Sequence, residues 1–404
     1  MGERLVGIED VRAAAALLAD VAIRTPVEGS RWLSTEVGGR VDVKCENLQR
    51  TGSFKIRGAY VRIARLSDEE RANGVVAASA GNHAQGVALA ASMLGATAKI
   101  YMPEGAPLPK VAATKAYGAE VVLHGLTVDE SLAAAQEYAE KCGSVFIHPF
   151  DHADVIAGQG TVGLEILDQV PDVRTVVVPT GGGGLVSGIA VAVKAVRPGV
   201  RVVGVQAEKA AAFPGSLAVG HPVPLDFMAT IADGIAVGSP GETTLSHVQR
   251  LVDDVVTVSD EALSRALLMC LERAKLVVEP AGVAAMAALM DEPNAFEPPV
   301  VAVLSGGNVD PLLMLRVIRH GLIAAGRYLS FRLRIPDRPG ELARLLGVLA
   351  HTGANVLDVE HLRTGPKLHL DEVEVALQLE TRGPEHCDDV LSALRAERYP
   401  LVFH

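Results

Sequence analysis

A lysine in an apolar, glycine-flanked stretch is the first residue whose setting suggests chemistry. Lys55 lies in the sequence TGSFKIRGAY, residues 51–60, and apolar residues at helical spacing follow it. With Ser53 as the expected N-cap, Lys55 falls in the first helical turn, where the helix dipole and burial both disfavour an ammonium. Both effects lower the pKa of the lysine and favour the neutral amine, the form that makes a Schiff base. The competing interpretation is a lysine whose stem covers apolar surface, and this stretch alone favours that one.

Four consecutive glycines follow an apolar strand in VVVPTGGGGLVSGIAVAVKAV, residues 176–196. Glycines let backbone N–H groups converge on an anion, and the start of the next helix adds further free N–H groups. The pattern favours a phosphate site over a mobile surface loop. The Walker spacing is absent, and GxGxxG fails because Val186 or Ser187 stands at its last position. Glu208, at the end of the next strand, keeps a dinucleotide as a weaker alternative.

Two polar loops follow other apolar strands. In ASAGNHAQG, residues 78–86, Asn82 offers donors and an acceptor, and the neighbouring N–H groups suit a carboxylate. His83 in the same loop is, taken alone, more typical of a structural histidine than of a base. In VVAVLSGGNVD, residues 300–310, Ser305 falls at the ligand end of a sheet, although a cap or turn serine fits equally well. An amine, a phosphate cup, an amide and a neutral hydroxyl are together what pyridoxal phosphate requires.

Alternating apolar runs and Ala-rich helical patterns must position these groups between about residues 40 and 325. The strand candidates are RVDVKCE, GVVAAS, TAKIYMP, EVVLHG, SVFIHP, RTVVVPT, VRVVGVQAE and PVVAVLSGG. Short apolar strands separated by helices predict parallel βαβ units with helices on both sheet faces. Ligands of such α/β folds sit at the carboxyl ends of the strands.

The pattern changes near residue 326. FRLRIP and EVEVALQLE alternate apolar with polar residues, and each is followed by an amphipathic helical pattern. The order βαββαβ with one-sided strands predicts a small ferredoxin-like domain. We therefore expect a catalytic domain of two interleaved α/β subdomains over residues 1–325 and a separate domain over residues 326–404.

Composition narrows the class of protein. Of 404 residues, 49% are hydrophobic and 21% charged, which suits two or three domains with large cores. The net charge of −11 argues against nucleic acid or an anionic membrane as partner, and no apolar run approaches the roughly 18 residues of a membrane span. The N-terminus lacks a signal-peptide pattern. The four cysteines form no CxxC pair, so we expect neither a disulfide framework nor a metal cluster, and a cytoplasmic location.

The motifs SFKIRGA, SAGNHAQG, TGGGGL and SGGN, in this order, resemble those of the fold-type II pyridoxal-phosphate enzymes. Within that fold class the resemblance is to threonine dehydratases (threonine ammonia-lyases) and the related serine racemases, and it covers about residues 5–320. It implies a tryptophan-synthase-β-like fold with two parallel-sheet subdomains. The tail, with DRPG between strand and helix, resembles a single ACT domain, a regulatory module that binds amino acids.

The resemblance also implies a role for each matching residue. It makes Lys55 the cofactor lysine and general base, packs Phe54 on the cofactor ring, and pairs Asn82 with the ring oxygen and Ser305 with the ring nitrogen. Glu279, in VVEPAG, is expected near the cofactor. The residues expected to hold the phosphate are Gly181, Gly182, Gly183, Gly184 and Leu185. The residues expected at the substrate carboxylate are Ser79, Ala80, Gly81, Asn82 and His83.

The reaction that this resemblance implies is the dehydration and deamination of L-threonine to 2-oxobutanoate and ammonia, and also of L-serine to pyruvate. A hydroxyl at the ring nitrogen, in place of a carboxylate, favours prompt loss of a β-leaving group. The alternatives with the same fold are serine racemisation, 3-hydroxyaspartate dehydration and β-replacement as in cysteine synthase. A non-catalytic amino-acid sensor is the alternative from another class, and the retention of every cofactor group argues against it.

Three further expectations depend on single positions. Serine racemases carry a serine hydroxyl where this chain has Ala80, so we expect little racemisation. Relatives with a cation site need a carboxylate that is absent here, where Ala212 and Pro214 lie near Glu208, so we expect no metal. Isoleucine or valine is the expected effector, approaching the backbone at Gly340, and the expected assembly is a homodimer or homotetramer.

Overall fold

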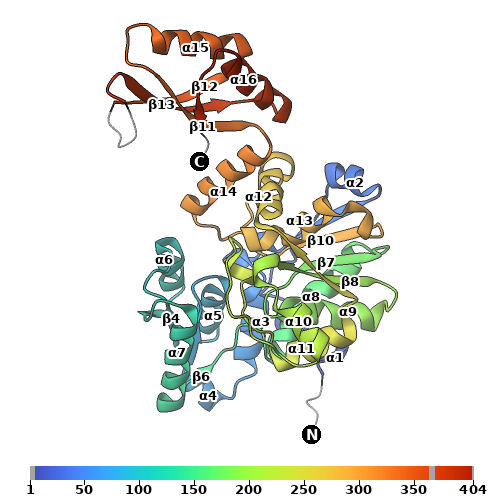
Figure 1. The fold of residues 1–404 in the computed structure, drawn as a ribbon. Coiled ribbons are helices and arrows are strands. Elements are labelled where there is room, and N and C mark those ends of the chain that lie inside the picture. The colour runs from blue at the N-terminus through green and yellow to red at the C-terminus, as the bar shows by residue number, and fades with distance from the viewer. Residues whose placement is uncertain (1–4, 364–368, 403–404) are drawn as a thin grey trace. The chain divides into compact units, whose positions relative to one another are not determined.

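The computed structural model describes residues 5–363 and 369–402 of the chain. The chain divides into two compact units, residues 1–314 and 315–404 (Figure 1). The division falls within helix α14 (Pro311–Ala324), N-terminal to the change of sequence pattern near residue 326. No helix in the described residues is long and apolar enough to cross a bilayer.

The larger sheet of the first unit has six strands in the order β1-β2-β10-β7-β8-β9. Its strands are β1 (Val27–Gly29), β2 (Val41–Cys45), β7 (Thr175–Pro179), β8 (Arg201–Ala207), β9 (Asp254–Val258) and β10 (Val300–Leu304). All neighbours from β2 to β9 pair in parallel, whereas β1 runs antiparallel to β2. Every residue of β2, β7 and β10 is buried, because helices cover both faces of the sheet. The expected parallel α/β sheet is therefore confirmed.

The smaller sheet of the first unit has the order β5-β4-β3-β6, and all of its strands are parallel. Its strands are β3 (Val75–Ala78), β4 (Ala98–Met102), β5 (Glu120–Leu123) and β6 (Val145–Phe146). A second parallel sheet agrees with the two subdomains that the sequence implies. The carboxyl ends of the strands of each sheet lead into the loops that carry the site.

Thirteen helices surround these two sheets within the described residues of the first unit. They are α1 (Ile8–Leu17), α2 (Arg31–Val37), α3 (Lys55–Ala64), α4 (Asp68–Ala72), α5 (Asn82–Met93), α6 (Leu108–Ala116), α7 (Val128–Cys142), α8 (Ala153–Gln169), α9 (Gly184–Val196), α10 (Ala212–Val219), α11 (Glu242–Leu251), α12 (Asp260–Met269) and α13 (Ala284–Asp291). Two short turns of helix, η4 (Asp233–Ile235) and η6 (Pro280–Val283), border the site.

The second unit has its own sheet, in the order β12-β13-β11-β14. Its elements after α14 are β11 (Tyr328–Pro336), α15 (Glu341–Thr352), β12 (Asn355–Leu362), β13 (Glu372–Glu380), α16 (Pro384–Ala396) and β14 (Leu401–Val402). All of its strand pairs are antiparallel, and alternate residues of β11 and β13 are buried against the helices. The expected βαββαβ order is present, and the end of the last predicted strand, Phe403 and His404, lies outside the described residues.

Candidate active site

Helix α3 begins at Lys55 itself, one residue later than a Ser53 cap would require. The residue at the N-cap position is Phe54, and no side chain caps the helix, so the expected capping role of Ser53 is wrong. Ser53 is extended, and its backbone forms an isolated antiparallel bridge with Gly306. The amide of Phe54 donates to the carbonyl of Ser305 at 3.3 Å. The start of α3 is thus joined to the loop that follows β10.

The amine of Lys55 lies in a partly buried position that favours its neutral form. Its Nζ donates to the carbonyl oxygen of Pro149 at 2.9 Å and lies 5.3 Å from the centroid of the Phe54 ring. Burial lowers the pKa of Lys55 from 10.5 to about 8, although the nearby carboxyl of Glu279 acts in the opposite direction. The lowered pKa that the sequence suggested for this lysine is present, with desolvation as its main cause.

Three side chains from distant parts of the chain form a polar network beside Lys55. Asn82 Nδ2 donates to Glu279 Oε1 at 2.6 Å, and Asn308 Nδ2 donates to Asn82 Oδ1 at 2.9 Å. Burial is the main cause that raises the pKa of Glu279 to about 7, and the charge of Asp233 acts in the same direction. The network fixes the orientation of the Asn82 amide. Asn82 and Glu279 were predicted from the sequence, whereas Asn308 was not, although it stands in the SGGN motif.

The four glycines form a tightly packed turn between β7 and α9. Gly183 adopts the left-handed conformation with φ of 95°, and α9 begins at Gly184, so the amides of its first turn are free of intrahelical partners. A Cβ on Gly182 would come within 2.4 Å of the Phe150 ring, and one on Gly183 within 2.6 Å of Phe213. This packing opposes the interpretation of the segment as a mobile loop. Because Phe150 follows the carbonyl that accepts from Lys55, the turn and the amine lie near each other.

The loop between β3 and α5 presents its backbone at the end of the smaller sheet. The amide of Gly81 donates to Ser79 Oγ at 3.1 Å, and α5 begins at Asn82. The ring of His83 instead lies against the carbonyl of Ile147, at 2.8 Å from Nε2. Burial, reinforced by the charge of Lys55, lowers the pKa of His83 to about 3, so this imidazole is neutral at pH 7. His83 therefore has the setting of a structural histidine, and only its backbone faces the loop.

Ser305 lies at the carboxyl end of β10 and is 4% exposed. Its amide donates to the carbonyl of Gly282 at 3.3 Å, while its carbonyl accepts from Phe54. These contacts hold Ser305 between the start of α3 and the turn η6, which directly follows Glu279. Among the described residues, no group of three or more His, Cys, Asp or Glu side chains is placed to hold a metal ion.

The residues of this site fit pyridoxal phosphate. A half-buried amine, the free amides of a helix start after a glycine turn, an oriented amide and a buried hydroxyl all come from the carboxyl-end loops of two parallel sheets. The chain belongs to the family described as Pyridoxal-phosphate dependent enzyme, whose family model matches residues 18–306. Pyridoxal phosphate is accordingly its cofactor.

Comparison with individual proteins shows which enzymes of this family the chain resembles. The chain is 46% identical over 395 residues to the L-threonine ammonia-lyase of Thermotoga maritima, a match that covers 98% of each chain. The structure of threonine deaminase isoform 2 from Solanum lycopersicum is similar with a TM-score of 0.75 at 38% identity, covering 79% of this chain and 91% of that one. The structure of maize serine racemase is similar with a TM-score of 0.74 at 38% identity, covering 80% and 99%.

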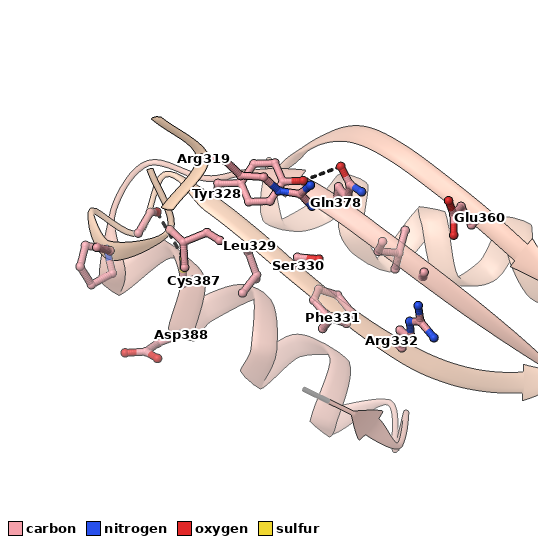
Figure 2. Close-up of a pocket in the computed structure, with 16 residues that line it drawn as sticks. Arg319, Tyr328, Leu329, Ser330, Phe331, Arg332, Glu360, Gln378, Cys387 and Asp388 are labelled. Carbon is pink, nitrogen blue, oxygen red and sulfur yellow. Dashed lines mark hydrogen bonds between the residues drawn. The ribbon is translucent and has the colours of Figure 1, made fainter. Parts of the chain in front are cut away.

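A cavity of about 780 Å³ lies in the second unit, among residues of α14, β11, β13 and α16 (Figure 2). The guanidinium of Arg319 lies over the Tyr328 ring at 5.0 Å, and the Tyr328 hydroxyl donates to Gln378. Arg332 and Glu360 add charges of both signs to its lining. Gly340, the position expected from the sequence to bind the effector, does not line this cavity, and a Cβ on it would have no atom within 4 Å.

Proposed function

We propose that the protein is an L-threonine ammonia-lyase that also converts L-serine to pyruvate. The observation that carries the proposal is the partly buried amine of Lys55, with its pKa lowered to about 8, next to the glycine turn and the Asn82 network. The 46% identity to an L-threonine ammonia-lyase over 98% of both chains supports threonine as the substrate. The maize serine racemase similarity keeps racemisation as a second candidate activity.

The proposed chemistry assigns a role to each group of the site. The cofactor, when bound, supplies the electron sink that stabilises negative charge at the substrate α-carbon. The glycine turn and Leu185 would hold its phosphate, Asn82 and Ser305 would hold its ring oxygen and ring nitrogen, and Phe54 would pack on the ring. Glu279 orients Asn82 through the 2.6 Å hydrogen bond.

Lys55 acts as the general base. Its neutral amine accepts the α-proton of L-threonine. The bond between the β-carbon and the hydroxyl oxygen breaks, and one proton, replaced in balance by the one that Lys55 took up, passes to the leaving hydroxyl, which departs as water and leaves the Lys55 amine neutral again. The resulting enamine takes up one water molecule and releases ammonia, so that the atoms of L-threonine equal those of 2-oxobutanoate and ammonia. The loop from Ser79 to His83 holds the substrate carboxylate through its backbone amides.

A turnover assay tests this proposal. The purified holoenzyme is expected to release ammonia and 2-oxobutanoate from L-threonine, and ammonia and pyruvate from L-serine. A holoenzyme that binds these amino acids but releases neither ammonia nor a keto acid would be a sensor, and the proposal would fail. D-Serine formed from L-serine as fast as pyruvate would favour the racemase activity instead.

We further propose that the second unit is an ACT-like regulatory domain that binds isoleucine or valine. Its βαββαβ order and the open backbone at Gly340, with φ of 90°, support an amino-acid site at the turn before α15. The cavity of Figure 2 offers a second place, with the cation of Arg319 for a carboxylate. Loss of the effector response in Arg319→Ala would favour the cavity, and loss in Gly340→Ala alone would favour the turn.

We propose that the protein assembles as a homodimer or homotetramer. Sedimentation velocity measures the mass of the assembly and tests this proposal.

A further inference from the structure

An ion pair at the site joins the half of the first unit that is built on the smaller sheet to the half that is built on the larger sheet. Lys110 belongs to α6, which follows β4 of the smaller sheet, and Asp233 opens the turn η4, which lies between β8 and β9 of the larger sheet. Lys110 Nζ lies 2.9 Å from Asp233 Oδ2, and the two side chains are 10% and 56% exposed. A lysine so deeply buried needs a partner of opposite charge or a ligand.

The surroundings of this ion pair are the groups assigned to the reaction. Lys110 Nζ lies 3.7 Å from the position that a Cβ on Gly81 would occupy, beside the proposed carboxylate loop. On the other side, a Cβ on Gly234 would lie 3.7 Å from Glu279 Oε1. A Cβ on Gly181 would lie 3.1 Å from the Cα of Ile235. The turn η4 therefore lies between the glycine turn and Glu279, and it directs Asp233 toward Lys110.

The position of Lys110 gives its ammonium a use beyond the ion pair. An ammonium carries three N–H donors, so it can hold a carboxylate of the protein and one of a ligand at once. The backbone amides of the neighbouring loop can donate to a carboxylate or to a neutral carbonyl group, so they discriminate weakly between the two. A buried cation adds a charge-assisted hydrogen bond, which favours the carboxylate. Asp233 keeps the ammonium in place while the site is empty of substrate and limits the cost of its burial.

We propose that Lys110 is a specificity-determining residue whose ammonium, oriented by Asp233, binds the substrate carboxylate on the loop from Ser79 to Asn82. This inference rests on the proposed substrate site in that loop. It makes Asp233 a positioning residue that acts through Lys110. The enzyme should consequently discriminate amino acids from their uncharged amides mainly through Lys110.

Equilibrium binding of two analogues that cannot lose a β-hydroxyl tests this inference. The probes are L-2-aminobutanoate and L-2-aminobutanamide, which differ in the carboxylate charge, and calorimetry on the holoenzyme gives both dissociation constants. Lys110→Gln is expected to weaken binding of the acid by about 10- to 100-fold, the range for a lost charged hydrogen-bond partner, and to leave the amide nearly unchanged. In turnover, KM for L-threonine should rise by a similar factor with little change in kcat, because uniform binding is lost.

The partner variant separates carboxylate binding from a purely structural ion pair. Asp233→Asn keeps the ammonium of Lys110, so this variant should retain the preference for the acid over the amide. Lys110→Arg keeps a positive charge at this position, so it should show most of the preference that Lys110→Gln loses. Lys115→Gln, on an exposed position of the same helix, is the matched control and should change neither constant. If Lys110→Gln and Asp233→Asn weaken the acid and the amide alike, the pair only holds the two halves together and the inference is wrong. A holoenzyme that prefers the acid through Lys110 but releases no ammonia from L-threonine would overturn the proposed function and leave this inference standing.

Discussion

At the residue scale, the two imidazoles near the amine of Lys55 carry no positive charge at neutral pH. Burial lowers the pKa of His83 to about 3 and the pKa of His148 to about 4, so both imidazoles are neutral at pH 7. Burial also raises the pKa of Glu279 to about 7. The amine of Lys55, with a pKa of about 8, and the carboxyl of Glu279 therefore both titrate near neutral pH.

The pH dependence of cofactor attachment follows from the lowered pKa of Lys55. Attachment of the cofactor aldehyde needs the neutral amine. Burial penalises the protonated form, so the proton leaves at lower pH, and the rate of reconstitution of the apoenzyme should rise with pH and level off above about 8. Stopped-flow absorption of the bound cofactor measures this rate. A rate that keeps rising toward pH 10.5, the ordinary value for lysine, would contradict the burial argument.

Replacement of Lys55 by alanine should abolish turnover. The general-base role alone is typically worth about 10²–10⁴-fold, and covalent attachment of the cofactor is lost as well, so we expect a fall in kcat of more than about 10⁴-fold. Production of 2-oxobutanoate measures it, and the absorption band of the attached cofactor should disappear. Lys141→Ala, on the exposed side of α7, is the control. Near-normal turnover by Lys55→Ala would refute the assignment of this residue.

Ala80 is the residue that should separate dehydration from racemisation. Racemisation needs an acid on the face of the substrate opposite Lys55, and the methyl group of Ala80 can neither give nor take a proton. The Ser79 hydroxyl, one residue earlier, accepts a hydrogen bond from the amide of Gly81. Ala80→Ser should therefore raise the ratio of D-serine to pyruvate formed from L-serine, which chiral chromatography measures. An unchanged ratio in a folded, active variant would show that the proton comes from elsewhere.

At the scale of the element, the backbone of the glycine turn lies close against the Phe150 ring and leads directly into the first turn of α9. In Gly182→Ala the new Cβ would lie 2.4 Å from the Phe150 ring, so the ring and its neighbours must move. Overpacking of this kind typically costs about 1–3 kcal/mol, and the free energy of unfolding of the apoprotein should fall by that amount. Because the displaced amides are the ones that we propose bind the cofactor phosphate, the dissociation constant of the cofactor should also rise. Gly199→Ala, where a Cβ meets no atom within 4 Å, should change neither quantity.

The elements that carry the site were predictable where hydrophobic pattern decides structure. The apolar runs that became β7, β8 and β10 are buried on both faces, and such runs fit few other roles. The glycine turn was predictable because its conformation depends on four consecutive glycines between a strand and a helix, and these are neighbours in the sequence. The start of α3 at Lys55 was not predictable, because the backbone of Ser53 pairs with Gly306, a residue more than two hundred positions away, and Ser53 does not cap the helix.

Long-range polar contacts are what the sequence alone did not reveal. Lys110 and Asp233 are 123 residues apart, and Asn82 and Asn308 are 226 apart, so no spacing rule relates either pair. The strand β9 was missed for a different reason. Its residues are mostly half-exposed or exposed, so it lacks the continuous apolar run of the central strands. The polar partners therefore became visible only in the folded structure, whereas the loops that carry Asn82 and Asn308 were predictable from the sequence.

At the scale of the whole molecule, the chain consists of two units with separate cores. The second unit buries Phe331, Leu333, Leu345 and other apolar residues in a core of its own. All the residues assigned to the cofactor and substrate lie in the first unit. The division of labour that we propose, with catalysis in residues 1–314 and regulation in residues 315–404, follows from this separation.

A chain that ends at residue 326 tests this division. It keeps all of α14 and every residue assigned to the site, so it should bind the cofactor and release ammonia from L-threonine at a rate close to that of the full chain. It should lose the response to isoleucine and valine, because the unit that binds them is absent. Rates with and without each amino acid, together with the thermal midpoint of both chains, measure the two effects. An effector that binds the folded chain should raise the thermal midpoint of the full chain alone.

A regulatory effector must change the activity of the enzyme, and binding of the effector does not by itself produce such a change. A ligand shifts activity only by as much as its affinity differs between two states of the enzyme. A change that the effector causes in the dissociation constant of L-2-aminobutanoate must therefore be matched by an equal change in the affinity for the effector when L-2-aminobutanoate is bound. Calorimetry with isoleucine, with and without L-2-aminobutanoate, measures that coupling in the full chain. If the chain ending at residue 326 is folded and keeps the full response to the amino acid, the regulatory site lies in the first unit, and the role proposed for residues 315–404 is wrong.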